Sequence, residues 1–364
     1  MTDSSFMLEA LELAKKGKFT VQNGVCVGCI ISKNNEILGQ GWYEYYGAPH
    51  AEIKAIESIK EKYKDNYEEV LSGSILTVTL EPCSTFGKTP PCLDEILKHN
   101  FKKVIIGALD PSQSSVEKLK AAGIEVLLEE VPNDLNNGFF SALLHKKPYV
   151  RAKIAMSEDQ KISFIKDDQQ WITSTESRED GQKYRALSDL ILTGSGTVER
   201  DNPFLNVRNK EITKLKGFEQ PARGIITSSK LESSLNFFST QGKKYIFCKD
   251  QNIFENFQQN EEVSILEIEN TEDNKINLKE LLKKIHSLKF NDILLESGPT
   301  LITSFINEDL IDEFIIYIAP KMLSNTALSF FNGDESKSPF HSKQFKLIEE
   351  SIIKEDKKLI FKRI

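Results

Sequence analysis

The sequence predicts a two-domain α/β protein, and three observations support that fold class. The chain has 364 residues, which is long for a single hydrophobic core and favours two domains. Strand-like and helix-like apolar patterns alternate along most of it, as they do in layered α/β folds. The stretch Lys146-Lys147-Pro148 separates two such series, so we expect one domain at 1–145 and a second at 146–364.

The first series begins with a helix and a hairpin. Apolar residues at helical spacing predict a helix over 4–16 that stops at Gly17. Two strand-like runs, 25–32 and 36–43, flank the polar turn Lys33-Asn34-Asn35, which suits a hairpin. The other predicted elements are a helix opened by Pro49, strands at 74–80, 103–109 and 124–129, and helices at 90–99, 114–122 and 135–144.

The second series predicts another α/β domain, which begins with a strand at Tyr149. The helices between its strands are expected at 174–188, 278–288 and 300–307. The stretch 209–220 and the acidic stretch 250–275 are interpreted as surface excursions. Predicted strands cover 149–156, 190–193, 223–227, 244–248, 293–296 and 314–319, with two more in the C-terminal tail.

The composition of the chain limits the kinds of molecule with which the protein is expected to interact. The formal net charge of -7 argues against a general nucleic-acid binder, because affinity for phosphate backbones comes from clustered Lys and Arg. No apolar run reaches the roughly 18 residues that a membrane helix needs, and the N-terminus lacks a signal pattern. The five cysteines are an odd number and fall unevenly, so they form no disulfide framework. We therefore expect a cytoplasmic protein that acts on a small molecule, without nucleic acid or membrane.

Three residues with the chemistry of zinc ligands stand at boundaries of predicted elements. His50 begins one helix, Cys83 follows a strand, and Cys92 opens a second helix. One His and two Cys suit zinc, and a set of three protein ligands leaves the fourth position for water, as in catalytic sites. Zinc lowers the pKa of that water, so that hydroxide is available near neutral pH. We also expect Cys92 to ionise easily, because it lies at a helix N-terminus.

Glu52 is the candidate catalytic residue. Residues two positions apart do not share a helix face, so a separate role for Glu52 is favoured over joint coordination with His50. A carboxylate beside the water can pass a proton to a departing amine, as in zinc nucleobase deaminases. Taken singly, His50 is more often a capping or core histidine and each cysteine a buried thiol. A structural zinc site is disfavoured because no fourth ligand is apparent, and Cys26 and Cys29 are interpreted as packing residues.

The run at 79–92, TLEPCSTFGKTPPC, resembles the bifunctional riboflavin-biosynthesis deaminase/reductase family. Its long gap between the two cysteines, rich in Gly and Pro, separates it from cytidine and tRNA adenosine deaminases. The resemblance extends over nearly the whole chain, through Asn23 and residues 27–29, 47–52, 171–174, 196–198, 201–203 and 296–299.

That resemblance implies a cytidine deaminase-like α/β/α layered domain followed by a dihydrofolate reductase-like α/β domain. The first would use zinc to deaminate 2,5-diamino-6-(5-phosphoribosylamino)pyrimidin-4(3H)-one, and the second would use NADPH to reduce the ribosyl group to ribityl. It also implies a homo-oligomer, either a dimer or a tetramer. The implied cofactor-binding residues are Ala155, Trp171, Thr197, Asp201, Ser228 and Gly298. The implied substrate-binding residues are Asn23, Arg185, Leu205, Arg208 and Glu296.

General chemistry supports part of this second site. Gly298 lies between a predicted strand and a predicted helix, where bare N–H groups can receive a phosphate; alternatively, Gly298-Pro299 merely turns the chain. Arg185 and Arg208 could hold the substrate phosphate bidentately, although either alone is more often a surface charge. Trp171 is equally plausible as a core residue, and 201–203 as a turn.

Several departures from the family pattern leave alternatives open. The family has Ser-Leu-Asp-Gly where this chain reads Ser157-Glu158-Asp159-Gln160, and the acidic stretch 167–170 replaces a Ser-Gly segment. Tyr43 stands where a substrate-contacting His is common, and the loop after Asp110 is short. One alternative is therefore a deaminase whose second domain no longer reduces. Another is a non-catalytic binding or regulatory protein on the same fold, and NADH in place of NADPH also stays open.

Overall fold

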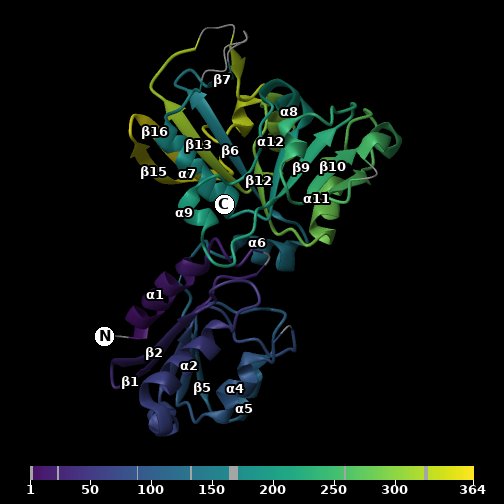
Figure 1. Ribbon diagram of the computed structural model, residues 1–364. Helices are drawn as coiled ribbons and strands as arrows, with labels where there is room; N and C mark the ends of the chain where they lie inside the picture. Colours follow the sequence, from purple (N-terminus) through teal and green to yellow (C-terminus); the bar gives the residue numbers. More distant parts are fainter. Residues whose placement is uncertain are drawn as a thin grey trace. The chain divides into compact units, whose positions relative to one another are not determined.

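The computed structural model describes residues 3–22, 24–87, 89–131, 133–163, 171–257, 260–323 and 327–364, and it divides into two compact units (Figure 1). Unit 1 comprises Met1–Leu143 together with Lys214–Glu219. Unit 2 comprises Leu144–Thr213 and Gln220–Ile364. The main division thus lies next to the joint expected between residues 145 and 146.

Unit 1 is built on a five-stranded sheet of order β2-β1-β3-β4-β5. The predicted hairpin is present, because β1 and β2 are antiparallel and both turn residues, Asn34 and Asn35, adopt the left-handed conformation that such turns require. β1 is also antiparallel to β3, whereas β3, β4 and β5 are mutually parallel. The strands are β1 (Gly28–Lys33), β2 (Glu36–Trp42), β3 (Ile75–Val78), β4 (Lys103–Ile106) and β5 (Glu125–Leu128).

Helices cover both faces of this sheet. Alternate residues of β1 point to opposite faces: Ile30 packs in a cluster with residues of α1, and Ile31 packs in a second cluster with residues of α2. This arrangement produces the α/β/α layers. The helices are α1 (Asp3–Ala14), α2 (Ala51–Tyr63), α3 (Tyr67–Leu71), α4 (Cys92–Lys98), α5 (Ser115–Ala121) and α6 (Asn137–Phe140), with short 3-10 segments at Lys15–Gly17 and Lys64–Asn66 and a π-helical turn at Ser141–His145.

Unit 2 is built on a nine-stranded sheet of order β11-β10-β9-β8-β12-β6-β13-β16-β15 (Figure 1). The strands from β11 to β13 in this order are parallel, and the C-terminal hairpin adds β16 and β15 in antiparallel pairing. The nine strands are β6 (Tyr149–Ser157), β8 (Leu190–Gly194), β9 (Ala222–Thr227), β10 (Lys244–Cys248), β11 (Val263–Glu267), β12 (Asp292–Leu295), β13 (Glu313–Ala319), β15 (Phe345–Ile353) and β16 (Asp356–Arg363). A separate two-stranded sheet pairs β7 (Lys161–Ser163) with β14 (Leu328–Ser329).

The helices of unit 2 complete an α/β arrangement around this sheet. The predicted helices at 174–188, 278–288 and 300–307 correspond to α7, α11 and α12. None of the helices among the described residues of the chain is long and apolar enough to cross a membrane. The helices are α7 (Thr175–Ala186), α8 (Ser195–Asp201), α9 (Lys210–Thr213), α10 (Asn236–Ser239), α11 (Leu278–Ser287) and α12 (Pro299–Asn307), with 3-10 segments at Gln251–Phe257 and Glu335–Lys337.

The interpretation of 250–275 as a surface excursion is wrong. This stretch contains β11, which forms the outer edge of the sheet beside β10. Phe254 and Phe257 are buried in a core cluster together with Val263. Acidic residues around these apolar side chains lower the mean hydropathy, so the sequence pattern hides a packed segment. In the stretch 209–220, Ile212 of α9 is likewise buried, and 214–219 is grouped with unit 1.

Candidate active site

The start of α2 places two of the candidate residues of unit 1. His50 is the N-cap residue, with extended backbone angles (φ -67°, ψ 164°), and Glu52 lies in the first helical turn. The helix begins close against β2, since a Cβ on Gly41 would lie 2.4 Å from the carbonyl oxygen of Ala51. Glycine at position 41 therefore allows the helix start, and with it His50, to lie directly on the sheet.

Cys83 lies within the loop between β3 and α4, and Cys92 lies directly after the end of that loop. Cys92 is the first residue of α4 and directly follows Pro90-Pro91. The loop folds back on itself, because the N–H of Leu93 donates to the carbonyl oxygen of Cys83 at 3.2 Å. The N–H of Cys92 donates to the Cys83 sulfur, also at 3.2 Å.

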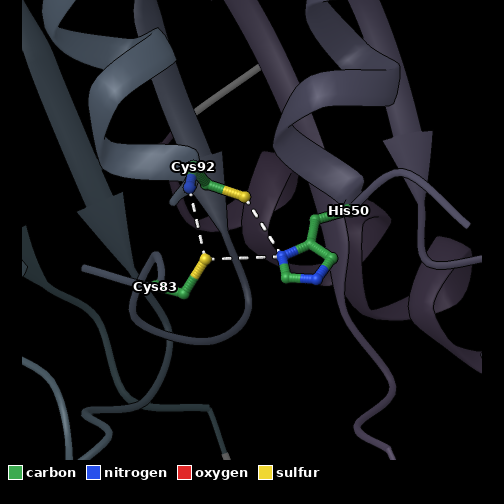
Figure 2. A group of neighbouring side chains, drawn as sticks. All are labelled: His50, Cys83 and Cys92. Carbon is green, nitrogen blue, oxygen red and sulfur yellow. Dashed lines mark hydrogen bonds between the residues drawn. The ribbon is translucent and has the colours of Figure 1, made fainter. Parts of the chain in front are cut away.

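The side chains of His50, Cys83 and Cys92 point toward one another (Figure 2). The His50 Nδ1 lies 3.2 Å from the Cys92 Sγ and 3.5 Å from the Cys83 Sγ, and all three ligand atoms lie within 4.8 Å of one another. With bond lengths of about 2.3 Å to sulfur and about 2.0 Å to nitrogen, a tetrahedral zinc site separates N and S ligands by about 3.5 Å. The observed separations fit a zinc ion with two thiolates and one imidazole.

The acidity of the two thiols differs from the expectation for Cys92. Hydrogen bonding from the Cys92 thiol, together with His50 and the Cys92 N–H, lowers the pKa of Cys83 to about 4. The pKa of Cys92 is instead raised by its hydrogen bond to Cys83 and by burial. The geometry does not support the prediction that Cys92 itself ionises easily, because its helix N–H points at the neighbouring Cys83 sulfur and favours a thiolate there.

Glu52 lies beside this group but outside it. Its side chain is buried, at 3% exposure, and burial raises the pKa of the carboxyl group. The carboxyl group interacts with the Cys92 thiol and is not one of the three converging ligands. A buried carboxyl group beside a metal site is placed to accept and release protons during a reaction there.

The other cysteines of unit 1 pack as expected. Cys26 and Cys29 are both buried thiols. Cys29 lies in β1 among apolar side chains, and burial raises the pKa of its thiol, with a further contribution from the charge of Glu52. Cys26 precedes the strand, so the argument from alternation along a strand does not apply to it.

Tyr43 lies against the histidine ligand. Its ring meets the His50 ring edge to face, with centroids 5.3 Å apart. Its hydroxyl oxygen accepts a hydrogen bond from the N–H of Gly47 at 2.8 Å, and Gly47 has a positive φ. Through this hydrogen bond, Tyr43 stabilises the loop that leads into α2. The expected substrate-contacting residue Asn23 lies outside the described residues.

Unit 2 contains a buried ion pair at the end of β12. Both oxygens of Glu296 accept from Arg185, Oε1 from Nε at 2.6 Å and Oε2 from Nη2 at 2.9 Å. Lys153 on β6 adds a second cation, 3.8 Å from Oε2. Burial alone would raise the pKa of Glu296. The charges of Arg185 and Lys153 outweigh this effect and lower the pKa to about 2. Arg185 is thus no surface charge.

Sequence reasoning missed Lys153. It is an ionisable residue in the centre of a strand whose other inward residues are mostly apolar, and this contrast was the available signal. Burial lowers the pKa of Lys153.

Arg208 lies close enough to share this cluster. Burial and the charge of Arg185 lower the pKa of Arg208. Its Nη1 donates to the Asn206 side chain at 3.2 Å. The Nη1 of Arg185 donates to the Asn206 carbonyl oxygen at 3.0 Å. Both guanidinium groups therefore donate a hydrogen bond to Asn206. The side chain of Leu205 is buried in the core.

Thr197 and Gly298 come together at the ends of two strands. The N–H of Gly298 donates to the Thr197 Oγ1 at 3.0 Å. Gly298 is the N-cap of α12 and Pro299 follows as the first helical residue, so this glycine does more than turn the chain. This hydrogen bond places the N-terminus of α12, a helix of nine residues, beside the N-terminal part of α8.

The remaining residues expected to bind the cofactor differ in their solvent exposure. Trp171 is 70% exposed, so its interpretation as a core residue is wrong; the Arg178 guanidinium lies 4.7 Å from its ring centroid. Asp201 ends α8 and pairs with Arg200, and Asn202 after it is the left-handed C-cap. Ala155 on β6 is half-buried and Ser228 after β9 is exposed.

Residues 157–160 form a closed turn, in which the N–H of Gln160 donates to the carbonyl oxygen of Ser157 at 2.9 Å. Gln160 stands where the family has glycine, and it adopts a left-handed φ of 60°. Glu158 is exposed, so no buried apolar contact is required at that position. Asp159 accepts a hydrogen bond from the N–H of Leu323 at 3.0 Å and caps the turn. The acidic stretch 167–170 lies outside the described residues.

Comparison with known proteins decides the family. Residues 148–359 match the RibD C-terminal domain, and residues 1–108 match the cytidine and deoxycytidylate deaminase zinc-binding region. The riboflavin biosynthesis protein RibD of Buchnera aphidicola is 36% identical over 379 aligned residues, with 99% of this chain and 98% of the relative covered. The chain belongs to the RibD family.

Solved structures agree with this assignment over the whole length. Acinetobacter baumannii RibD, form 1, is 32% identical with a TM-score of 0.86, and the match covers 100% of this chain and 99% of that one. A diaminohydroxyphosphoribosylaminopyrimidine deaminase/5-amino-6-(5-phosphoribosylamino)uracil reductase from Thermotoga maritima is 28% identical with a TM-score of 0.84, covering 99% and 98%.

These comparisons confirm the predicted fold class and the predicted enzyme class. The N-terminal region is a cytidine deaminase-like, zinc-binding domain, and the C-terminal region is the reductase domain of the RibD family. The chain is an enzyme of riboflavin biosynthesis with deaminase and reductase activities. Neither alternative, a deaminase alone or a non-catalytic protein, is favoured by any of the comparisons.

Proposed function

We propose that unit 1 deaminates 2,5-diamino-6-(5-phosphoribosylamino)pyrimidin-4(3H)-one and that unit 2 then reduces its ribosyl group to ribityl with NADPH. The domains that carry these steps are 1–145 and 146–364. The convergence of one imidazole and two thiols beside the buried Glu52 carries this proposal. The printed name of the Thermotoga maritima neighbour supports the choice of substrate for both steps.

His50, Cys83 and Cys92 hold the zinc ion in the deamination step. The low pKa of Cys83 means that this ligand is already a thiolate at neutral pH. Cys92 loses its proton when the ion binds, because a coordinating thiol is deprotonated. A zinc ion in this position supplies Lewis-acid activation of water.

Glu52 moves the protons of that reaction. Water adds across the ring C=N bond at the pyrimidine carbon that carries the amine, so that one proton goes to the ring nitrogen. The bond to the amine then breaks, and ammonia leaves with a ring carbonyl in its place. The Glu52 carboxylate takes a proton from the attacking water and delivers it to the leaving nitrogen. Burial raises the pKa of this carboxyl group, which favours its protonated form between the two transfers.

Thr197 and Gly298 hold a phosphate group of the cofactor in unit 2. The N–H groups that follow Pro299 in the first turn of α12 lie at the positive end of the helix dipole and suit an anion. Ala155, Trp171, Asp201 and Ser228 complete the proposed cofactor side. NADPH in this site supplies the hydride that reduces the ribosyl carbon.

Arg208 and Arg185 form the proposed substrate side of unit 2 together with Glu296 and Leu205, whereas Asn23 is the proposed substrate contact of unit 1. The Arg185 guanidinium is already held by Glu296 and the Asn206 carbonyl oxygen. The Arg208 guanidinium group makes fewer hydrogen bonds than that of Arg185, and it is therefore the group that binds the substrate phosphate. Glu296 holds Arg185 in place and fixes the charge of this cluster.

The two steps can be followed in one experiment. The purified full-length protein, loaded with zinc, is mixed with the phosphoribosyl diaminopyrimidine, and ammonia is measured first. NADPH is then added and its near-ultraviolet absorbance is followed. Ammonia release followed by NADPH oxidation supports the proposal, whereas ammonia release without NADPH oxidation would leave unit 2 without its proposed reaction. No ammonia release from the zinc-loaded protein would refute the first step.

We also propose that the protein assembles as a homodimer or tetramer in the cytoplasm, which follows from the family resemblance. Light scattering after size exclusion measures this directly, and a monomer mass of 41.3 kDa would contradict it.

A further inference from the structure

The loop that carries Cys83 is held by a second segment, 110–116, through two side chains that flank the cysteine. This segment includes the first two residues of α5, and we call it the 110–116 loop. Glu81 precedes Cys83 by two residues, and Ser84 follows it directly. Both make hydrogen bonds to residues that lie roughly thirty positions later in the chain. Neither side chain belongs to the converging ligand group.

Glu81 is a buried carboxylate, at 7% exposure, that receives only donors. Its Oε1 accepts from the Ser115 N–H at 3.0 Å, the Ser115 hydroxyl at 2.9 Å and the Val116 N–H at 3.4 Å. Its Oε2 accepts from the Asp110 N–H at 3.2 Å. Both oxygens are therefore engaged, and four donors fix the position of one carboxylate.

Ser84 adds a second tie on the other side of Cys83. Its N–H donates to the Gln113 Oε1 at 2.7 Å, and its hydroxyl oxygen accepts from the Ser114 N–H at 3.1 Å. The same hydroxyl group donates to the Gln113 Oε1 at 3.1 Å. The backbone on both sides of Cys83 is thus held by one short loop.

We propose that Glu81 is a positioning residue of the metal centre, which fixes the Cys83 sulfur through its hydrogen bonds to the 110–116 loop. This inference rests on the proposed zinc site. Cys83 follows the end of β3 in irregular backbone, where no strand pairing holds it. Groups that orient a metal ligand from outside the ligand set commonly change metal affinity about 10- to 100-fold when they are removed.

Glu81→Gln is the sharpest substitution, because it preserves size but leaves one acceptor oxygen in place of two. Its amide nitrogen would face a backbone N–H, either that of Asp110 or that of Ser115, and two donors cannot bond to each other. The loop must shift to relieve this contact. The Cys83 backbone shifts with it.

The matched control is Asp189→Asn in unit 2. Asp189 is also 7% exposed, and its Oδ2 accepts from the N–H groups of Asn291 and Asp292 at 2.7 and 2.9 Å. The two substitutions remove the same kind of interaction. Only Glu81 lies beside a proposed metal ligand, so the control separates general loss of stability from a change at the metal.

The test uses the full-length protein loaded with zinc or with cobalt(II). We expect Glu81→Gln to release zinc to a chromogenic chelator about 10- to 100-fold faster than wild type and to alter the thiolate-to-cobalt absorption band. Asp189→Asn should leave both unchanged. If Glu81→Gln does not fold, Ser84→Ala carries the same test, with faster zinc release expected.

Three results would overturn the inference. The first is a folded Glu81→Gln protein with wild-type zinc release and a wild-type cobalt spectrum. The second is equally fast zinc release from the Asp189→Asn control. The third, a wild-type protein that binds no zinc, would refute the proposed zinc site as well and is thereby distinguishable from the other two.

Discussion

Replacement of Glu296 by glutamine should destabilise unit 2 by about 3 kcal/mol at neutral pH, because it leaves two buried cations without their counter-charge. The side chains of Arg185 and Glu296 are 11% and 12% exposed, and two hydrogen bonds join them. Lys153 is held against the same carboxylate. The substitution keeps the shape of residue 296 but removes its charge.

The magnitude follows from the pKa of Glu296. The ion pair lowers it from 4.5 to about 2, and each pKa unit corresponds to about 1.4 kcal/mol, so the charged form gains about 3 kcal/mol on folding. Removal of one partner from a buried pair typically costs about 3 to 5 kcal/mol. Because the folded pKa is depressed, this contribution is complete above pH 4.5 and is lost as the pH falls toward 2.

Urea unfolding measures the effect if the signal comes from unit 2 alone. The chain has two tryptophans, Trp42 in unit 1 and Trp171 in unit 2, so a Trp42→Phe background leaves Trp171 as the fluorescent reporter. The control is Glu280→Gln, which removes an exposed ion pair with Lys283 and should change stability by less than about 0.5 kcal/mol.

The pH dependence provides the refutation. At pH 3 the difference between wild type and Glu296→Gln should fall to about half of its value at pH 7. A loss below about 1 kcal/mol at pH 7, or an equal loss at the two pH values, would show that the carboxylate charge is not what stabilises this cluster.

Two further predictions concern the two units separately. Glu52→Gln should lower kcat for ammonia release about 100- to 10,000-fold while the protein keeps its zinc, because a proton carrier is lost and no ligand is; retained deamination would refute the role of Glu52. Gln160→Gly should raise the stability of unit 2 by about 1 kcal/mol, because glycine adopts the left-handed φ at this position without strain. A lower Tm for Gln160→Gly would contradict this explanation of the turn.

Sequence patterns were sufficient where a residue's neighbours along the chain determine its role. The central strands β8 and β12 are runs of buried apolar residues, and periodicity identifies both. His50, Cys83 and Cys92 could be singled out because each begins or follows a regular element, and such boundaries are where ligands converge.

Contacts between distant residues could not be read in the same way. Arg185 and Glu296 are 111 positions apart, and their pairing depends on the parallel order of β8, β12 and β6. The low pKa of Cys83 depends on an N–H from Cys92 that only the folded loop supplies. The packed segment around Phe254 was missed because its apolar residues are dispersed among acidic ones.

X-ray absorption at the zinc edge tests the central claim most directly. The zinc-loaded wild-type protein should show two sulfur scatterers at about 2.3 Å and two nitrogen or oxygen scatterers at about 2.0 to 2.1 Å. Cys83→Ser should reduce the sulfur shell to one. A zinc ion surrounded by four sulfurs, or by none, would contradict a centre made of His50, Cys83 and Cys92.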